Sequence, residues 1–379
     1  MKNKPKILFL IDSLQTGGAE KSLLEITKRF KRVEPVICVV YKDKNHLENE
    51  FVKHNIKLIH LNIPRNNYLW LFIGFKKLKK VIKKGENSTI QTYLFKSKFI
   101  GRLFKLLNRD IILIDSIVSD TYSKNRYKNQ SKISNIKLNI VKFFDKITSN
   151  VPDYYLVISK SLKHIGVKRF NIKEKKINVI YRGRNINDYY VDRKRKKTDN
   201  FIFIAVGRLV LQKNYPLIIE ATHFVKQKTN KNFEVRIFGE GPLKQKLINK
   251  TKEQKVNNII RFYGRSESIK EELKKADVFI FASILEGLGG ALVEAKISGL
   301  PIIVSNINVF IEQIENKKNG LIFDVNNPKE LAKKMLWVME NYDKAFLLGK
   351  EAQKDAISNF DIEIIAQQTE QFYLDIINK

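Results

Sequence analysis

An uninterrupted apolar run, a glycine turn and a helix-like stretch follow one another at the start of the chain and again in its second half. The first occurrence covers residues 6–30 and the second covers residues 201–228. A short run that is apolar at every position is typical of a strand buried on both faces of a parallel sheet. Strand-like and helix-like stretches continue to alternate after each occurrence. The sequence therefore predicts two α/β units, each built on a doubly wound and mostly parallel sheet.

The length of the chain agrees with two units. At 379 residues it exceeds the roughly 250–300 residues at which a single hydrophobic core stops growing. A basic stretch without apolar periodicity, residues 184–199, lies between the two patterns. We therefore expect an N-terminal domain at 1–183, an interdomain linker at 184–199 and a second domain at 200–355, followed by a C-terminal helix at 356–379.

The sequence also bears on the compartment. No stretch approaches the roughly 18 consecutive apolar residues that mark a membrane-spanning helix. The basic start, Met1–Lys6, leads into a short strand-like run and not into the longer apolar region of a signal peptide. The lone Cys38 excludes a disulfide within the chain and fits a reducing compartment. We expect a cytoplasmic protein, and we also consider peripheral attachment at the inner face of the cell membrane.

The net charge of +32 is concentrated in the first half of the chain. Residues 1–199 contain 45 Lys and Arg against 17 Asp and Glu, whereas residues 200–379 contain 26 against 22. This imbalance predicts an anionic partner for the first half, such as a membrane surface, a phosphorylated acceptor or a nucleic acid. No module that interleaves basic residues with stacking aromatics is evident, so we expect no nucleic acid partner.

Two stretches of the first half combine lysines with apolar and aromatic residues at helical spacing. They are residues 70–84 and 95–109. Basic amphipathic helices with aromatic anchors bind anionic lipid at the membrane interface. We expect both stretches to form helices that attach the chain to an anionic membrane surface. The alternative is an ordinary outer helix whose basic face is solvated.

Glycines and cations follow the first strand-like run of each half. Gly17 and Gly18 open a helix, where backbone N–H groups and the helix start attract a phosphate; a tight turn is the alternative. Arg208 and Lys213 lie five residues apart, after the strand-like run at 201–206. An Arg fork and a Lys point charge on one loop suit a diphosphate, with a solvated loop as the alternative.

The strongest signal is a pair of glutamates around a glycine-rich turn. Glu286 and Glu294 bracket the turn at 287–290, which follows a strand-like run and opens a helix. The helix start attracts an anion, and carboxylates accept hydrogen bonds from the neighbouring hydroxyls of a sugar. Two acids near a phosphate also fit Mg²⁺. Arg208 and Lys213 would make such a metal redundant, so we expect a metal-free site.

Together these motifs resemble the retaining glycosyltransferases of family four. The resemblance rests on G-G-A-E at 17–20, G-R…K-N at 207–214, G-E-G-P at 239–242 and E-G-x-G…E-A at 286–295, in that order. It implies a GT-B fold, in which two Rossmann-like domains face each other across a cleft and the C-terminal helix crosses back to the first domain. It also implies a nucleotide-diphosphate sugar donor, held mainly by the second domain, with no cofactor and no metal.

The resemblance further implies roles for single residues. Arg208 and Lys213 would act in catalysis by neutralising the diphosphate as the leaving group forms. Glu286 would bind hydroxyls of the donor sugar, and Glu294 those of the ribose. Net retention would follow from attack on the face that the phosphate leaves, so paired glycosidase-type carboxylates are not needed. The other residues expected to bind the donor are Gly17, Gly18, Gly207, Gly239, Gly241, Arg265, Gly287, Leu288, Gly289 and Gly290.

One feature departs from the family. Many members carry a His at the end of a first-domain strand, near the reacting sugar. Residues 114–120, which occupy that place here, contain no His. Asp120 and Ser119 are the nearest substitutes, and we take Asp120 as the candidate catalytic residue of the first domain.

The acceptor is expected to be a glycan, in particular a lipid-linked or surface polysaccharide intermediate. This expectation follows from the family resemblance and from the basic first half. One alternative keeps the fold but changes the activity to a sugar-nucleotide epimerase or a glycan phosphorylase. Another is a catalytically inactive partner subunit, suggested by the missing His. A third, of a different class, is a basic nucleic-acid- or membrane-binding protein without transferase activity.

Overall fold

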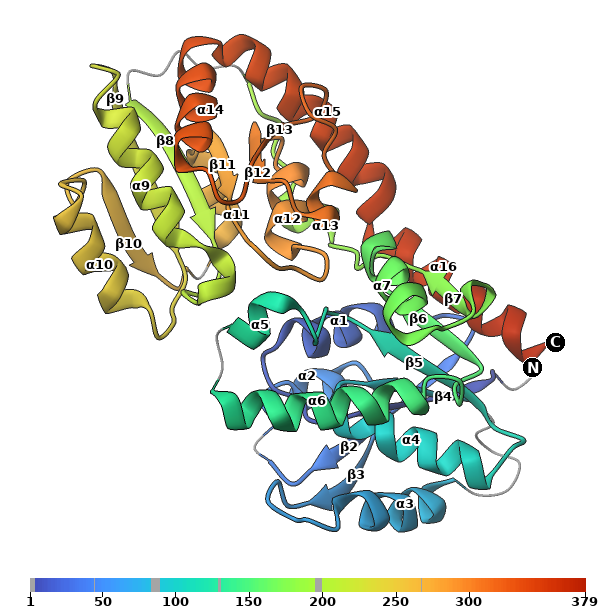
Figure 1. The fold of residues 1–379 in the computed structure, drawn as a ribbon. Helices are drawn as coiled ribbons and strands as arrows, with labels where there is room; N and C mark the ends of the chain where they lie inside the picture. Colours follow the sequence, from blue (N-terminus) through green and yellow to red (C-terminus); the bar gives the residue numbers. More distant parts are fainter. Residues whose placement is uncertain (1–3, 44, 83–88, 129–130, 195–199, 267) are drawn as a thin grey trace. The chain divides into compact units, whose positions relative to one another are not determined.

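The computed structural model describes residues 4–43, 45–82, 89–128, 131–194, 200–266 and 268–379. The chain divides into two compact units. Unit 1 contains Met1–Tyr122, Arg126–Gly183 and Ile362–Lys379, and unit 2 contains Ser123–Asn125 and Arg184–Asp361. In each unit helices cover both faces of a parallel sheet (Figure 1). The predicted α/β class is therefore confirmed for both units.

Unit 1 is built on a seven-stranded sheet in the order β3-β2-β1-β4-β5-β6-β7. Its strands are β1 (Lys6–Ile11), β2 (Glu34–Tyr41), β3 (Lys57–Ile63), β4 (Thr89–Tyr93), β5 (Ile112–Ile117), β6 (Tyr154–Val157) and β7 (Ile177–Val179). The helices along this part of the chain are α1 (Gly18–Thr27), α2 (Glu48–Lys53), α3 (Trp70–Val81), α4 (Phe95–Leu107), α5 (Lys124–Lys128), α6 (Lys132–Ile147), α7 (Lys160–Phe170) and the 3₁₀ turn η1 (Glu174–Lys176). The order of the strands reverses between β1 and β4, so the switch point of this sheet lies there.

Strand β1 lies in the middle of the first core. All five residues at positions 7–11 are completely buried. Alternate side chains point to opposite faces of the sheet. Ile7 and Phe9 pack with residues of α1, and Leu8 and Leu10 pack with residues of α3 and α4. The side chains of this run therefore pack into two apolar layers, one on each face of the sheet, as the sequence pattern predicts.

The C-terminal helix α16 (Ile362–Ile377) also belongs to the core of unit 1. Its Tyr373 is completely buried, lies edge-on to Phe9 with ring centres 6.0 Å apart, and donates its hydroxyl hydrogen bond to Gln91. Its Glu370 accepts hydrogen bonds from the backbone N–H groups of residues 31–33. The end of the chain thus packs on a unit that residues 1–183 supply for the most part.

Unit 2 is built on a six-stranded sheet in the order β10-β9-β8-β11-β12-β13. Its strands are β8 (Asn200–Val206), β9 (Asn232–Phe238), β10 (Ile260–Gly264), β11 (Val278–Phe281), β12 (Ile302–Ser305) and β13 (Leu321–Phe323). Its helices are α8 (Ile186–Tyr189), the 3₁₀ turn η2 (Leu211–Lys213), α9 (Tyr215–Lys226), α10 (Lys244–Glu253), α11 (Ile269–Lys275), α12 (Gly290–Ile297), α13 (Asn308–Ile311), α14 (Pro328–Glu340) and α15 (Tyr342–Phe360). The switch point lies between β8 and β11.

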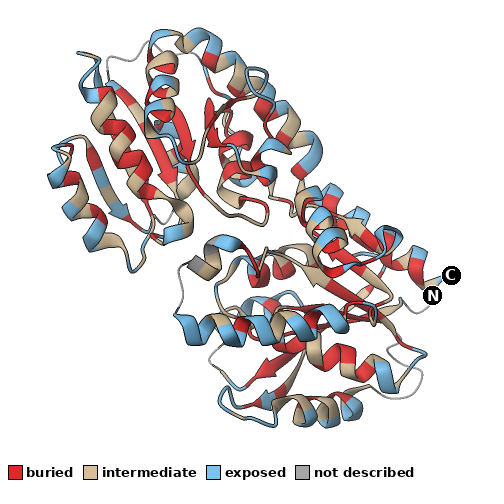
Figure 2. Cartoon of the chain, in the orientation of Figure 1, coloured by how far each residue is buried: buried red, intermediate tan, exposed pale blue. Residues whose placement is uncertain are grey.

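Two apolar layers enclose the sheet of unit 2. One contains residues of α9, α10 and α14, and the other contains residues of α11, α12, α13 and α15. Figure 2 shows the strands mainly in the colour of buried residues, with exposed residues on the outer sides of the helices. Both switch points therefore lie on rigid, well-packed sheets that can hold loops in fixed positions.

Part of the expected linker packs on unit 2. The guanidinium group of Arg193 is buried and donates hydrogen bonds to the backbone carbonyl oxygens of Leu273, Ala276 and Ser298. Residues 195–199 of this stretch lie outside the described residues.

Strand β4 is a central strand that the apolar-run criterion misses. All five of its residues are buried, although Thr89, Gln91 and Thr92 are polar. Gln91 donates hydrogen bonds to the hydroxyls of Tyr93 and Ser116, at 2.9 and 2.8 Å. Internal partners replace water for the Gln91 amide, so a strand with polar residues can be buried.

The helices predicted at 70–84 and 95–109 are present as α3 and α4 and end at Val81 and Leu107. Residues 83 and 84 lie outside the described residues. The sequence expectations include no helix at 132–147, where the structure has α6. Across the described ranges, none of the helices is both long and apolar enough to cross a membrane.

Candidate functional site

Two loops meet at the switch point of unit 2. The loop at 207–213 follows β8, and the loop at 282–289 follows β11, the neighbouring strand. The backbone N–H of Ile284 donates a hydrogen bond of 2.9 Å to the carbonyl oxygen of Gln212, which joins the loops. In open α/β sheets, ligands bind outside the carboxyl ends of the strands at the switch point. The predicted residues of the second half therefore lie where this topology places a ligand.

Lys213 and Glu286 form an ion pair in this place. The Lys213 Nζ lies 2.5 Å from Glu286 Oε1, and both side chains are less than 20% exposed. The Ser283 hydroxyl donates a second hydrogen bond, of 2.9 Å, to the same carboxylate oxygen. The Lys213 ammonium also lies 4.5 Å from the centre of the Phe281 ring. A cation and a carboxylate on adjacent loops are thus held together and close to the surface.

The glycine-rich turn before α12 is fixed by its surroundings. Gly289 has a φ of +85°, which favours glycine, and its Cα faces the rings of Phe281 and Phe310. The buried Gln313 amide donates a hydrogen bond of 2.7 Å to the carbonyl oxygen of Leu288. The turn therefore presents the free N–H groups at the start of α12 in a fixed direction, which suits an anion.

Arg184 is a member of this site that the sequence does not reveal. Its Nε lies 2.8 Å from Glu294 Oε1, and a side chain at Gly290 would overlap its guanidinium group. The backbone N–H of Arg184 donates a hydrogen bond of 2.7 Å to the carbonyl oxygen of Phe360. Glycine at position 290 thus makes room for a cation at the N-terminal end of α12. No spacing rule signals this, because Arg184 is more than 100 residues away in sequence.

Close backbone packing explains the glycines of the G-E-G-P turn. A Cβ at Gly239, whose φ is +139°, would overlap the carbonyl oxygen of Gly207. A Cβ at Gly241 would come within 2.5–2.8 Å of the backbone of Leu209. The backbone N–H of Leu209 donates to the carbonyl oxygen of Glu240 at 3.0 Å. Gly239 and Gly241 therefore let the loop after β9 support the loop that carries Arg208 and Lys213.

Arg208 and Arg265 are both exposed, at the ends of β8 and β10. Within the described part of the chain, Arg208 makes no ion pair with a carboxylate. It is therefore the cation of the loop at 207–213 that has its charge available. In that same part of the chain, no three His, Cys, Asp or Glu side chains are grouped so that they could hold a metal ion.

Gly17 and Gly18 lie in unit 1, at the start of α1. Gly17 is the N-cap residue, and a Cβ on it would overlap the carboxylate of Glu20. Glu20 is 7% exposed, and burial raises the pKa of its carboxyl group. A carboxylate of the helix itself thus lies beside the N–H groups that the sequence assigns to a phosphate.

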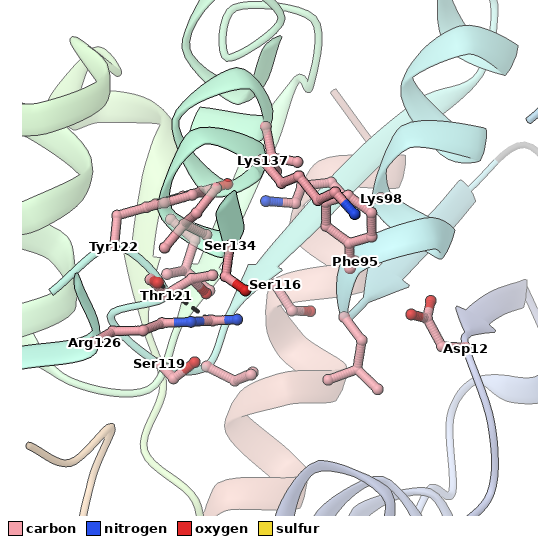
Figure 3. Close-up of a pocket in the computed structure, with 15 residues that line it drawn as sticks. Asp12, Phe95, Lys98, Ser116, Ser119, Thr121, Tyr122, Arg126, Ser134 and Lys137 are labelled. Carbon is pink, nitrogen blue, oxygen red and sulfur yellow. Dashed lines mark hydrogen bonds between the residues drawn. The ribbon is translucent and has the colours of Figure 1, made fainter. Parts of the chain in front are cut away.

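Unit 1 has a pocket of about 500 Å³ at the carboxyl ends of β1, β4 and β5, shown in Figure 3. Its lining combines cations with apolar side chains: Lys98, Arg126 and Lys137 with Phe95, Leu138 and Val141. Asp12, directly after β1, accepts hydrogen bonds from the backbone N–H groups of Lys96 (3.1 Å) and Ser97 (2.8 Å). Asp12 therefore caps α4 at the edge of the pocket, and burial raises its pKa.

The residues expected to replace the missing His lie near this pocket. Ser119 lines it. The Asp120 carboxylate is ion-paired with Arg169 of α7 and also accepts a hydrogen bond of 3.1 Å from the backbone N–H of Tyr122. Asp115, from the same segment, is completely buried, with Arg102 Nη2 2.7 Å from its carboxylate. Both acids of the segment are thus held by arginines of unit 1.

Comparisons with known proteins agree with the geometry. Residues 188–355 match the family described as Glycosyl transferases group 1. The chain is 26% identical to the capsular polysaccharide biosynthesis glycosyltransferase CapH of Staphylococcus aureus, over 97% of this chain and 98% of that protein. It is 24% identical to the UDP-Gal:alpha-D-GlcNAc-diphosphoundecaprenol alpha-1,3-galactosyltransferase of Escherichia coli, over 80% of this chain and 79% of that one. The crystal structure of Anabaena HepE in complex with UDP and glucose matches with a TM-score of 0.80 at 19% identity, over 98% of this chain and 100% of that chain.

The sheet topology and the comparisons together show that the chain is a glycosyltransferase with the GT-B fold. The match to the glycosyl transferases of group 1 covers residues 188–355, which lie in unit 2. The predicted fold class and the transferase activity are confirmed. The relatives named above are glycosyltransferases, and they give no support to an epimerase, a phosphorylase or a nucleic-acid-binding protein.

Proposed function

We propose that the chain transfers a hexose-type sugar from a nucleotide-diphosphate sugar to a lipid-linked glycan, with retention of configuration and without a metal ion. The observation that carries this proposal is the charge arrangement beside the loops after β8 and β11. Lys213 is paired with Glu286, and Arg184 with Glu294. A diphosphate needs cations, and the hydroxyls of a sugar and a ribose need acceptors. One site in unit 2 offers both.

Lys213 and Arg208 are the residues we assign to the diphosphate. When the donor binds, the Lys213 ammonium exchanges the Glu286 carboxylate for a phosphate oxygen, and Glu286 becomes free to accept hydrogen bonds from the sugar. Arg208 adds a planar fork from the same loop. Fixed cations stabilise the charge that develops on the leaving diphosphate, which is the part that a metal plays in other enzymes.

The chemical step follows from these positions. The bond between the anomeric carbon and the diphosphate oxygen breaks, and an acceptor hydroxyl bonds to the same face of that carbon. The leaving phosphate oxygen takes the hydroxyl proton. Because the new bond forms on the face from which the old one left, the configuration is retained. Glu286 holds the donor sugar by its hydroxyls during the exchange and forms no covalent bond with it.

Glu294 is the residue we assign to the ribose. Its Oε1 accepts from Arg184, and the second carboxylate oxygen can accept from a ribose hydroxyl. The N–H groups at the start of α12 and the Arg184 guanidinium both bring positive charge to the neighbourhood of Gly290. We expect the glycines at 287, 289 and 290 to contact the donor through their backbones.

The pocket of unit 1 supports a lipid-linked acceptor. It combines the cations Lys98, Arg126 and Lys137 with apolar side chains, which fits a phosphate group attached to an apolar chain. The E. coli relative carries diphosphoundecaprenol in the name of its acceptor. Ser119 lies on the pocket wall, and Asp120 follows it. We place this reaction at the cytoplasmic face of the cell membrane, where a lipid-linked acceptor would present its phosphate group to this pocket.

Donor binding tests the proposal. The purified chain is mixed with UDP-, GDP- and dTDP-sugars in the presence of EDTA, and thermal shift and slow donor hydrolysis are followed. We expect the sugars of one nucleotide class to raise the melting temperature. In Glu286→Ala, the shift caused by the nucleotide-sugar should fall more than the shift caused by the free nucleotide. If no donor binds and Glu286→Ala changes nothing, the assignment of the site in unit 2 is wrong.

Retention is tested on the product. Proton NMR of the first product formed gives the coupling constant of the anomeric proton, which distinguishes axial from equatorial linkage. An α-linked donor should give an α-linked product. A β-linked product, or a complete loss of turnover in EDTA that Mg²⁺ restores, would contradict the proposed step.

A further inference from the structure

Helix α6 carries an apolar stripe on its outer side. Six large apolar residues, each between 49% and 68% exposed, recur at helical spacing: Ile133, Ile136, Ile140, Phe143, Phe144 and Ile147. At 100° per residue all six fall within one narrow face. Leu138 and Asp145, on the other side of the helix, are the buried residues. An ordinary surface helix buries its apolar stripe, so α6 has the reverse arrangement, and Figure 2 shows it mainly as exposed.

Cations border this stripe. At 100° per residue, Lys132 and Lys137 flank the two edges of the stripe, and Lys146 lies farther round on the side of Lys132. The single acid of the helix, Asp145, is buried and paired with Lys98 and Arg102, so it does not offset these charges on the outer face. The stripe lies on the half of the chain that holds 45 Lys and Arg against 17 Asp and Glu. A contiguous apolar face with a basic border marks an interaction site.

Helices α3 and α4, which the sequence predicts to contact the membrane, bury much of their apolar surface in the core of unit 1. Leu78 of α3 is completely buried, as is Ile100 of α4, and Phe104 of α4 is 2% exposed. On α3, Phe72 is 62% exposed and is preceded by Leu69 and Tyr68, which are 63% and 98% exposed just before the helix, so the exposed apolar residues are confined to its N-terminal end. Helices α3, α4 and α6 all carry lysines at helical spacing. A continuous apolar stripe on the outer side distinguishes α6 from the other two.

We propose that α6 lies in the interface of an anionic lipid bilayer, with its apolar stripe among the acyl chains and its lysines at the headgroups. This proposal extends the transfer reaction proposed above to the place where it occurs, but it does not depend on it. A second copy of the chain is a poorer occupant, because pairing two such faces would bring two lysine borders together. An anionic bilayer offers both the apolar depth and the negative charge.

This placement has a consequence for the acceptor. Leu138 and Val141, on the inner side of α6, and Lys137, at the edge of the stripe, line the pocket in unit 1. A helix seated at the headgroup level would bring that pocket to the phosphate groups of membrane lipids. The same helix would then anchor the protein and border the acceptor site.

Vesicle binding tests this inference. The full chain is sedimented with vesicles of neutral phospholipid, or of neutral phospholipid mixed with an anionic one, without donor and at near-physiological salt. We expect strong binding to the anionic vesicles only. The double variant with Ile136→Gln and Phe143→Gln should weaken binding to anionic vesicles at least about tenfold, because it replaces two apolar side chains of the stripe with polar ones. The matched control Phe72→Gln removes an equally exposed apolar residue from α3 and should change binding less than about twofold.

The outcomes are distinguishable. Equal melting temperatures of the variants and the wild type show that the exposed substitutions preserve the fold. Equal binding of the double variant and the wild type overturns the proposal, as does equal binding to neutral and anionic vesicles. A wild-type dimer that the double variant dissociates, with unchanged vesicle binding, assigns the stripe to a second copy instead. Donor binding is measured without vesicles, so a failure of membrane binding leaves the proposed transfer reaction untouched, and the reverse also holds.

Discussion

The carboxylates of unit 2 that we assign to the donor are already paired with cations in its absence. Lys213 lies 2.5 Å from Glu286, and Arg184 lies 2.8 Å from Glu294. All four side chains are between 14% and 25% exposed, so each charge has exchanged part of its water for its partner. Such pairs keep charges in position, and a ligand that offers equivalent contacts to both partners can open them.

Arg184→Met tests the second pair. The variant keeps an unbranched apolar side chain but removes the hydrogen bond to Glu294 and the charge beside Gly290. Hydrogen bonds to charged groups contribute about 1.5–3 kcal/mol, so we expect nucleotide affinity to fall about tenfold or more by isothermal titration calorimetry. Turnover at saturating donor should change much less, because we assign Arg184 and Glu294 to the ribose and not to the reacting carbon.

The conservative variant Arg184→Lys serves as the control for this prediction. It retains the charge but not the planar fork, and it should fall between the wild type and Arg184→Met. Tighter nucleotide binding in Arg184→Met would contradict the account, because it would mean that Arg184 competes with the ribose for Glu294.

At the scale of residues, the sequence predicts only part of the site. The spacing after two strand-like runs brings Lys213 and Glu286 to neighbouring loops, because carboxyl ends of parallel strands lie along one edge of a sheet. Arg184 could not be found in this way, since its contact with Glu294 depends on tertiary packing. The roles of Arg208, Glu286 and Asp120 stay predictions, and the ion pair of Asp120 with Arg169 must open or reorient before that carboxylate can act.

At the scale of elements, the loops after β8 and β9 depend on each other. Gly207 donates its N–H to the carbonyl oxygen of Phe238, and Gly239 donates its N–H to that of Gly264. Gly239, with a φ of +139°, leaves no room for a Cβ against the Gly207 carbonyl oxygen. The loop that carries Arg208 and Lys213 is thus supported by backbone contacts and by the Tyr215 hydroxyl, which donates a hydrogen bond of 2.8 Å to the carbonyl oxygen of Gly207.

Gly239→Ala should therefore destabilise unit 2. Backbone strain and a clash with backbone atoms together should lower the free energy of unfolding by about 2–4 kcal/mol. The two tryptophans of the chain, Trp70 in unit 1 and Trp337 in unit 2, allow the units to be followed separately. Urea unfolding of unit 2 is measured by Trp337 fluorescence in a Trp70→Phe background.

Gly18→Ala, in unit 1, is the control for a glycine-to-alanine change, and its unfolding is followed by Trp70 fluorescence in a Trp337→Phe background. A Cβ at Gly18 would meet only the Arg182 guanidinium, at an ordinary 3.8 Å, so its effect should stay within about 0.5 kcal/mol. A Gly239→Ala variant as stable as the wild type would show that the loop can shift, and that glycine is not required there for packing.

Sequence patterns miss β4 and α6, two elements in which polar residues are buried or apolar residues are exposed. β4 is polar and buried, because Gln91, Tyr93 and Ser116 satisfy one another inside the sheet. α6 is apolar and outward, so its stripe does not indicate which side meets the core. Patterns succeed for β1 and β8, where apolar residues fill both faces of a central strand.

At the scale of the whole molecule, the C-terminal residues 362–379 follow unit 2 in the sequence but belong to unit 1. The repeated pattern of run, turn and helix predicts two α/β units, and two sheets are present in the described chain. Composition alone does not reveal that residues 362–379 pack on unit 1; the family resemblance implies it. Tyr373 of α16 is central to this packing, with the rings of Phe9 and Phe30 each 6.0 Å from its own.

Tyr373→Ala should destabilise unit 1 and spare unit 2. Removing a completely buried aromatic ring costs about 3–5 kcal/mol, so the Trp70 transition should move to lower urea while the Trp337 transition stays. Ile364→Ala, at a position of the same helix that is 39% exposed, is the control and should have a small effect. Equal shifts of both transitions would contradict the assignment of α16 to unit 1.

Donor consumption shows whether Lys213 and Glu286 act on the nucleotide-diphosphate sugar. The rate at which the nucleotide-diphosphate sugar identified by binding is consumed in EDTA is compared among the wild type, Lys213→Met, Glu286→Gln and Lys318→Met. Lys318 forms an ion pair of 2.7 Å with Glu315 in which both side chains are more than 65% exposed, so it controls for the loss of a lysine. We predict that kcat/KM falls about 100-fold or more in the first two variants, because each loses a contact to the reacting groups, and stays within about twofold in Lys318→Met. Equal rates in all four proteins would contradict the account.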